Sequence, residues 1–253
     1  MGIVMDLMTN ERIDYVNDKL SLIQRTDGLT FGTDALLLAG YINGKYKSGV
    51  EIGGGSGIIS MLLLTREKVG SVNCIEVQEE YAELIRRNAE LNSLSDRLTA
   101  ISADVREYKP GEECDLVFTN PPYMKSTSGA HNERTAKTVA RHEIFGDIRD
   151  FCHSGARLLR FGGTFAVVYR PDRLIDLIAA MRGEGVEPKR MTFVHADADA
   201  EPSMVLIEGK RGGKCGLLLT KPLIIYKDKD HKEYGEDMSY IMENGSFPPE
   251  YKR

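Results

Sequence analysis

Short apolar runs alternate with longer amphipathic stretches through the middle of the chain. Apolar runs bounded by glycine or polar residues predict strands, and apolar residues at helical spacing predict helices. In the first half we expect strands over Gly49–Ile52, Ser71–Val77, Leu98–Ser102 and Asp115–Thr119, and helices over Ile58–Lys68 and Glu79–Asn92. Alternation of this kind indicates βαβ units, a mainly parallel sheet and right-handed crossovers.

The second half continues the alternation and then breaks it. We expect helices over Ile148–Leu159 and Leu174–Arg182, and strands over Thr164–Tyr169, Met191–His195 and Met204–Glu208. Only residues 196–203 join the last two strands, which is too short for a crossover helix, so these strands run antiparallel. We predict an α/β fold with a seven-stranded, mainly parallel sheet and an antiparallel edge strand. It occupies residues 31–230, after an N-terminal extension (1–30) and before a polar C-terminal tail (231–253).

Composition excludes several classes of protein. The 253 residues are 42% hydrophobic and 28% charged, which suits one large domain. The longest nearly unbroken apolar stretch, Ile58–Leu64, is far shorter than the roughly 18 residues that a membrane helix needs. The start of the chain has no signal-peptide pattern. The four cysteines form no CxxC pair, which argues against a zinc site. We expect a cytoplasmic protein with no metal and no membrane association.

Net charge is −5, but its distribution is uneven. Residues 125–190 carry four more basic than acidic side chains, and this segment begins directly after the strongest chemical motif. A local basic face can attract phosphate groups to an acidic protein. The alternative is an ordinary solvated surface.

Four glycines lie between a predicted strand and a predicted helix. The pattern is acidic-x-GxGxG, formed by Glu51, Gly53, Gly55 and Gly57. A GxGxxG dinucleotide fingerprint would need a further glycine at position 58 or 60, where isoleucine and serine stand. The pattern resembles the first motif of S-adenosylmethionine-dependent methyltransferases, in which backbone approaches the ligand closely and a carboxylate can pair with its ammonium group. The alternative is a tight turn without a ligand.

Two further acids follow the next two predicted strands. Glu76 ends one strand, where such folds place a carboxylate against ribose hydroxyls. Asp104, followed by Val105, ends the next and resembles the position that meets the adenine of the cofactor. Taken singly, each is explained equally by a helix-preceding or loop acid. Because parallel strands end at one edge of a sheet, all three acids are expected to lie together there.

The most specific motif is Asn120-Pro121-Pro122-Tyr123, directly after a predicted strand. The prolines fix φ and remove two backbone donors. The carbonyl groups of the Asn120 side chain and the Pro121 main chain can both accept from one NH₂ group, and Tyr123 offers a flat face for a base. The motif is typical of methyltransferases that act on amino nitrogens next to sp² carbon, and this chemistry needs no metal.

Together these motifs resemble the bacterial tRNA adenine-N6 methyltransferases that modify the adenine beside the anticodon of valine tRNA. Further similar segments are Phe31–Leu38, Ala140–Glu143 and Lys221–Tyr226. The resemblance implies a Rossmann-like methyltransferase fold with S-adenosylmethionine as cofactor, covered by Thr33 and Asp34 and touched at its methionine end by Asn120. It also implies N6-methylation of a tRNA adenine, position 37. In the basic segment, Arg134, Lys137 and Arg141 are expected to contact phosphates. The role of His142 and the oligomeric state stay open.

Three alternatives remain. A protein glutamine-N5 methyltransferase uses the same motif but usually carries an N-terminal helical domain, and only about 30 residues precede Phe31 here. An rRNA guanine-N2 methyltransferase more often has Phe after the prolines and a duplicated domain. A non-catalytic, cofactor-binding subunit would have no reason to keep Asn120 and Tyr123 intact.

Overall fold

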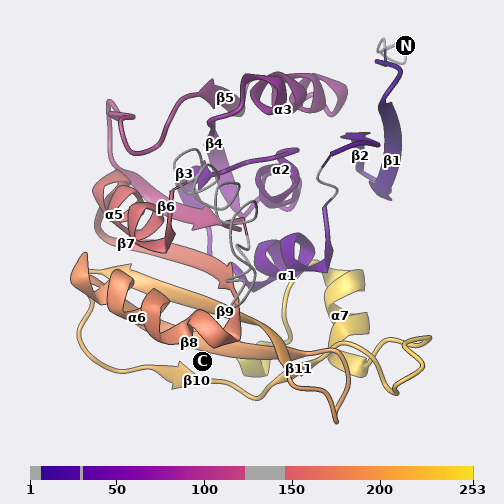
Figure 1. Cartoon of the computed structure of the whole chain (residues 1–253), viewed down its shortest axis with the longest axis vertical. Coiled ribbons are helices and arrows are strands. Elements are labelled where there is room, and N and C mark those ends of the chain that lie inside the picture. Colours follow the sequence, from indigo (N-terminus) through magenta and orange to yellow (C-terminus); the bar gives the residue numbers. More distant parts are fainter. Residues whose placement is uncertain (1–6, 29–30, 123–145, 253) are drawn as a thin grey trace, which may run out of the picture.

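A twisted sheet with helices on both faces forms the centre of the computed structural model, which describes residues 7–28, 31–122 and 146–252 (Figure 1). Its long strands are β3 (Tyr46–Ile52), β4 (Val69–Glu76), β5 (Leu98–Ser102), β6 (Cys114–Thr119), β7 (Leu159–Tyr169), β8 (Val186–His195) and β9 (Pro202–Arg211). Their order in the sheet is β8-β9-β7-β6-β3-β4-β5. Two short strands, β10 (Leu218–Leu219) and β11 (Leu223–Ile224), pair with β8.

The direction of the strands agrees with the predicted fold class. Strands β3 to β7 are parallel to one another, whereas β9 is antiparallel to both β7 and β8. The β8–β9 hairpin therefore closes one end of the sheet, with β9 one place in from β8. The seven long strands form the predicted, mainly parallel sheet. The predicted antiparallel edge strand is wrong in its position, because β9 lies between β7 and β8, and the short strands β10 and β11 bring the sheet to nine strands in the described residues.

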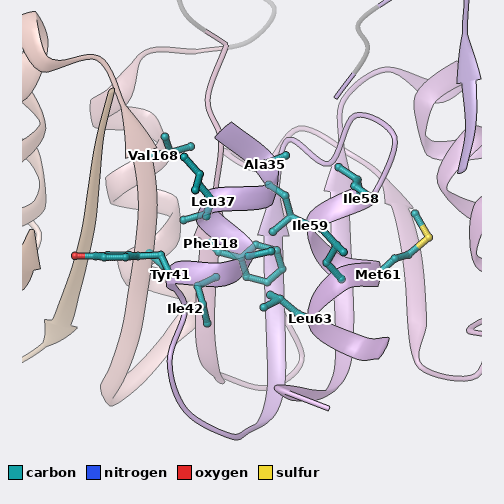
Figure 2. Close-up of a cluster of buried hydrophobic side chains, with 14 of the residues drawn as sticks. Ala35, Leu37, Tyr41, Ile42, Ile58, Ile59, Met61, Leu63, Phe118 and Val168 are labelled. Carbon is teal, nitrogen blue, oxygen red and sulfur yellow. The ribbon is translucent and has the colours of Figure 1, made fainter. Parts of the chain in front are cut away.

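Side chains that alternate along the strands pack into two separate hydrophobic cores, one on each face of the sheet. Leu116 and Phe118 of β6 face one core and Val117 faces the other, as the two-residue period of a strand requires. The first core includes residues of α1 (Thr33–Tyr41), α2 (Ile58–Thr65) and α3 (Glu79–Leu91); the second includes residues of α5 (Ile148–Leu158) and α6 (Leu174–Gly183). Figure 2 shows side chains of α1 and α2 gathered around Phe118.

Buried cations fix the C-terminal end of α1. The Lys68 ammonium donates to the carbonyl oxygens of Ala39 (2.8 Å), Gly40 (3.1 Å) and Ile42 (2.8 Å). The Arg190 guanidinium donates to the carbonyl oxygen of Tyr41. Burial lowers the pKa of Lys68, yet three donated bonds require the charged amine. These groups satisfy carbonyls that the end of a helix leaves open, so α1 is anchored to the sheet.

An N-terminal hairpin, β1 (Glu11–Asn17) and β2 (Leu20–Arg25), lies in the segment predicted only as an extension. It is held by Asn88 of α3 and by Asn92, the C-cap residue of the same helix one turn further on. Asn88 accepts from the amide of Ile23 (2.7 Å) and donates to its carbonyl (3.1 Å), and Asn92 does the same with Ser21 (3.0 and 2.7 Å). Side-chain amides therefore replace the backbone partners of a neighbouring strand.

The segment predicted as a polar tail contains α7 (Glu236–Asn244) and a 3₁₀ turn (Pro249–Tyr251). Phe247 and Tyr251 are fully buried, and the Phe247 ring stands edge-on to the Tyr41 ring at 5.2 Å between centroids. Residues 236–251 thus pack onto α1 as part of the first core. Among the described residues, no helix is both long enough and apolar enough to cross a lipid bilayer.

Candidate active site

A cavity of about 690 Å³ opens at the carboxyl ends of β3, β4, β5 and β6. Its wall includes Asp34, Glu51, Gly53, Gly55, Glu76, Asp104, Val105, Asn120, Pro121 and Pro122. This is the edge at which open α/β sheets bind ligands, and the volume suits a nucleoside-sized molecule. The sheet therefore gathers most of the predicted site residues around one space.

The glycine turn between β3 and α2 forms one wall. Gly53, Gly55 and Gly57 have φ values of +73°, +55° and +79°, which disfavour residues with a side chain. A Cβ on Gly54 would lie 2.1 Å from the Cys74 sulfur, whereas a Cβ on Gly55 would meet no atom within 4 Å. Gly54 is thus needed for packing, and Gly55 leaves open space beside the backbone. Gly57 caps α2 and does not line the cavity.

Glu76 ends β4 and braces this turn. Its Oε2 accepts from the backbone amide of Gly55 (3.0 Å), and its Oε1 accepts from that of Gln78 (3.0 Å). The side chain is largely buried. Because each carboxylate oxygen can accept more than one hydrogen bond, Glu76 keeps capacity for hydroxyl donors of a ligand.

Glu51 is the most buried acid of the site. Its Oε2 accepts from the backbone amide of Ser60 (3.1 Å) and from the Ser60 hydroxyl. Burial raises the pKa of Glu51 to about 7, because a low-dielectric surrounding disfavours the charged form. A ligand ammonium group beside it would favour the carboxylate again.

Asp104 is already paired within the protein. Both of its oxygens accept from the Arg106 guanidinium, and Oδ1 also accepts from the Arg106 backbone amide (2.9 Å). These bonds lower the pKa of Asp104. The carbonyl of the adjacent Val105 accepts from Arg157 (2.8 Å), which fixes the loop. A ligand amine at Asp104 would have to share the carboxylate with Arg106.

Asn120 lies at the end of β6, beside the strand that carries the glycine turn. The preceding Thr119 donates its hydroxyl to the carbonyl of Ile52 (2.8 Å), which holds the two strand ends together. The Asn120 Nδ2 donates to Oδ2 of Asp34 (2.9 Å). Its Oδ1 is buried, and no donor reaches it within the described part of the chain. Buried acceptors are normally satisfied, so this oxygen is suited to a donor from a ligand.

Comparison with known families decides the class. The family described as "Methyltransferase small domain" matches residues 25–175, more than half of the chain. The chain belongs to the methyltransferase small domain family. It is therefore a methyltransferase, as the glycine and Asn-Pro-Pro-Tyr motifs predict.

Curated relatives within this class share one activity in their names. The chain is 30% identical over 188 residues to a "tRNA1(Val) (adenine(37)-N6)-methyltransferase" of Porphyromonas gingivalis, covering 70% of this chain and 72% of the relative. A relative of the same name from Phocaeicola vulgatus is 26% identical over 180 residues, covering 71% and 76%. The predicted family is thus confirmed.

Solved structures support the fold. A structure described as a predicted O-methyltransferase, protein Atu636 from Agrobacterium tumefaciens, has a TM-score of 0.67 at 23% identity and covers 84% of this chain and 96% of its own. M. jannaschii TYW2 in complex with AdoMet has a TM-score of 0.57 at 15% identity, covering 82% and 89%. Both comparisons bear on the fold alone, which is the predicted methyltransferase fold.

Several predicted residues of the methyltransferase are not among the described residues of the cavity wall. Thr33 begins α1 but is not among the residues that line the cavity. Tyr123, Arg134, Lys137, Arg141 and His142 lie outside the described residues. Within the described ranges, no group of three or more His, Cys, Asp or Glu residues is arranged to hold a metal ion.

The cavity also has walls that the sequence analysis did not assign to the site. Phe31, Tyr81 and Phe151 are aromatic residues that line it, and Asp27, Gly28 and Gln78 line it from the hairpin end and the start of α3. The backbone amide of Phe31 is held by the Gln24 side chain (2.9 Å). Tyr81 lies among the buried residues of α3, and helical spacing in the sequence alone cannot separate a cavity wall from the core.

Proposed function

We propose that this protein transfers a methyl group from S-adenosylmethionine to the exocyclic N6 amine of an adenine in tRNA, at position 37 of valine tRNA. The observation that carries the proposal is the buried Asn120 Oδ1, an acceptor for which the described part of the chain supplies no hydrogen-bond donor. It lies in the motif typical of methyltransferases acting on planar amines. The shared name of the relatives supports the tRNA adenine as substrate.

The amine of adenine is a poor nucleophile because its lone pair is delocalised into the ring. The Asn120 Oδ1 and the Pro121 carbonyl supply two acceptors for its two protons. Holding both protons favours a pyramidal nitrogen, whose lone pair is then free for attack. Such preorganised acceptors act most strongly where charge develops. When bound, S-adenosylmethionine supplies a methyl group on a positively charged sulfur.

The described residues fit this cofactor. Open space beside Gly55 admits a ligand next to the backbone, and Glu76 retains acceptor capacity next to it. The buried Glu51 offers a carboxylate to an ammonium group. We assign Gly53, Gly55 and Glu76 to the ribose side, Glu51 to the methionine end, and Asp104 with Val105 to the adenine of the cofactor.

The tRNA would meet an acidic protein, with a net charge of −5. Phosphate contacts must then come from local basic groups, for which we propose Arg134, Lys137 and Arg141. An anticodon-loop adenine is unpaired, so turning it into the cavity costs less than extracting a base from a duplex. With tRNA as the substrate, we propose that the protein acts in the cytoplasm.

The test is methylation of defined RNA. Purified protein is incubated with unmodified valine tRNA and S-adenosylmethionine, and the nucleosides are identified by mass spectrometry. We expect N6-methyladenosine, and none from the same tRNA with guanine in place of adenine 37. Exclusive formation of N2-methylguanosine, or methylation of glutamine in a protein substrate without any tRNA product, would replace this proposal by one of its alternatives.

A further inference from the structure

Asp34 contacts the catalytic amide of Asn120. We propose that Asp34 is a positioning residue, whose carboxylate fixes the Asn120 side chain with Oδ1 turned toward the target amine. The inference rests on the proposed function and deepens it. It also gives Asp34 a partner within the protein, in place of the covering contact to the cofactor that the family resemblance implies.

The orientation of the amide follows from hydrogen-bond chemistry. A carboxylate can only accept, so the Asn120 atom that lies 2.9 Å from Oδ2 of Asp34 must be the NH₂ nitrogen. The Oδ1 atom then points the other way. A half-turn about the last side-chain bond would place two acceptors against each other. The charge of Asp34 therefore selects the one orientation in which Asn120 can accept a proton from the substrate.

Two rigid elements carry this pair. Asp34 lies in the first turn of α1, and its Oδ1 accepts from the backbone amide of Ala35 (2.9 Å). The same helix is fully buried at Leu37 and Leu38 and is anchored at its far end by Lys68. On the other side, the Thr119 hydroxyl fixes the end of β6. The carboxylate and the amide therefore have little freedom to separate.

The alternative partner for Asp34 is the ammonium group of the cofactor. Substitution of a residue that binds the cofactor and substitution of a residue that orients Asn120 should change different properties of the enzyme. Loss of a cofactor contact weakens cofactor binding, whereas loss of orientation lowers the rate of methyl transfer from the bound state. Misplacing a reacting group by about 1 Å can cost on the order of 10²-fold in rate.

A double-mutant cycle tests the coupling. We expect Asp34→Ala to lower kcat by about 10- to 100-fold while S-adenosylmethionine affinity, measured by calorimetry, changes little. In the Asn120→Ala background, the same substitution should cost almost nothing more, because the amide that it orients is gone. Additive losses in the double variant, or a large loss of cofactor affinity in Asp34→Ala, would overturn the proposal.

Asp237 provides a matched control. It also lies in the first turn of a helix, α7, and accepts a side-chain hydrogen bond, from the Tyr251 hydroxyl (2.7 Å). Asp237→Ala removes a helix-terminal carboxylate that does not line the cavity. We expect it to lower the melting temperature but to leave kcat of the folded protein unchanged. An equal fall in kcat for both variants would assign the Asp34 effect to general destabilisation.

A second measurement does not depend on methyl transfer. The side-chain NH₂ resonance of Asn120 is assigned in ¹⁵N-labelled protein by its absence from Asn120→Ala. In Asp34→Ala its position should shift and its hydrogen exchange should speed up by about tenfold or more. An unchanged resonance would contradict the positioning role. If the wild-type protein methylated no tRNA, the proposed function would fail, while this measurement would still decide how Asn120 is held.

Discussion

The two halves of the carboxyl edge are built differently. On the half that we assign to the cofactor (the cofactor half), all three acids are bonded to the protein itself: Glu51 to Ser60, Glu76 to Gly55 and Gln78, and Asp104 to Arg106. On the half that we assign to the target base (the target half), the Asn120 Nδ2 donates to Asp34, whereas no donor within the described part of the chain reaches its Oδ1. Each acid of the cofactor half already has a partner within the protein, whereas Asn120 presents an acceptor without one among the described residues.

This difference separates two roles. The acids of the cofactor half brace the turns that shape the cavity, and they can share their remaining lone pairs with a ligand. Asn120 contributes little to the surrounding fold through Oδ1, so its carbonyl is available for chemistry. Substitutions in the first half should therefore change cofactor affinity, and substitutions in the second half should change the rate.

The largest effect is expected at Asn120. Asn120→Ala should lower kcat by roughly 10²–10³, since removal of one preorganised hydrogen-bond partner at a reacting centre costs that much. Single-turnover rates with saturating tRNA and cofactor measure the loss, and calorimetry should show similar cofactor affinity. Full activity in this variant would show that Asn120 takes no part in methyl transfer.

Glu76→Ala should act mainly on cofactor affinity. Hydrogen bonds to a charged group are worth about 1.5–3 kcal/mol, which corresponds to roughly 10- to 150-fold in Kd. Part of this loss comes from the Gly55 turn, which Glu76 braces. If kcat of Glu76→Ala fell while its calorimetric Kd for S-adenosylmethionine stayed constant, Glu76 would act on the rate and not on cofactor affinity.

A pH dependence should distinguish Glu51 from the other acids. Burial raises its pKa to about 7, so the carboxylate becomes protonated as the pH falls below that value. The neutral acid no longer attracts an ammonium group, and cofactor affinity should drop by about tenfold between about pH 7.5 and pH 6. Glu51→Gln should bind more weakly at pH 7.5 and lose this dependence. If the variant kept the same pH profile, another group would be responsible.

The smallest effect concerns Arg106. Its ion pair with Asp104 is partly exposed, and pairs of this kind contribute about 0–1 kcal/mol. Arg106→Ala frees the carboxylate for a ligand amine, so cofactor affinity should rise by at most about fivefold. A clear loss of affinity would instead make Arg106 itself a ligand contact.

Much of this arrangement follows from local sequence patterns. Each apolar strand is followed within a few residues by its own glycine or acid. Because the strands are parallel, their carboxyl ends meet at one edge of the sheet. The Asp34–Asn120 pair joins residues 86 positions apart, and neither neighbourhood signals the other. The hydrogen bond between Asp34 and Asn120 could therefore be identified only from the structure, which brings the start of α1 to the end of β6.

The N-terminal hairpin and the C-terminal segment show a second limit of prediction from the sequence. The hairpin over residues 11–25 is held by Asn88 and Asn92, and polar side chains on a helix give no hint that they will bond to a strand. Asn88 is fully buried beside Leu84 and Ile85 on one face of α3, although its side chain is polar. In the C-terminal segment, a few apolar residues within a charged sequence are enough to reach the core through Phe247 and Tyr251.

A crystal structure with S-adenosylhomocysteine and an anticodon stem-loop tests the central claim most directly. The distance to measure joins Asn120 Oδ1 and the N6 atom of the turned-out adenine. We predict a hydrogen bond of about 2.7–3.2 Å, with Nδ2 still bonded to Asp34 and the Glu51–Ser60 contact unchanged. An adenine seated in the cavity with its amine away from Asn120, and Oδ1 bonded to another donor, would contradict it.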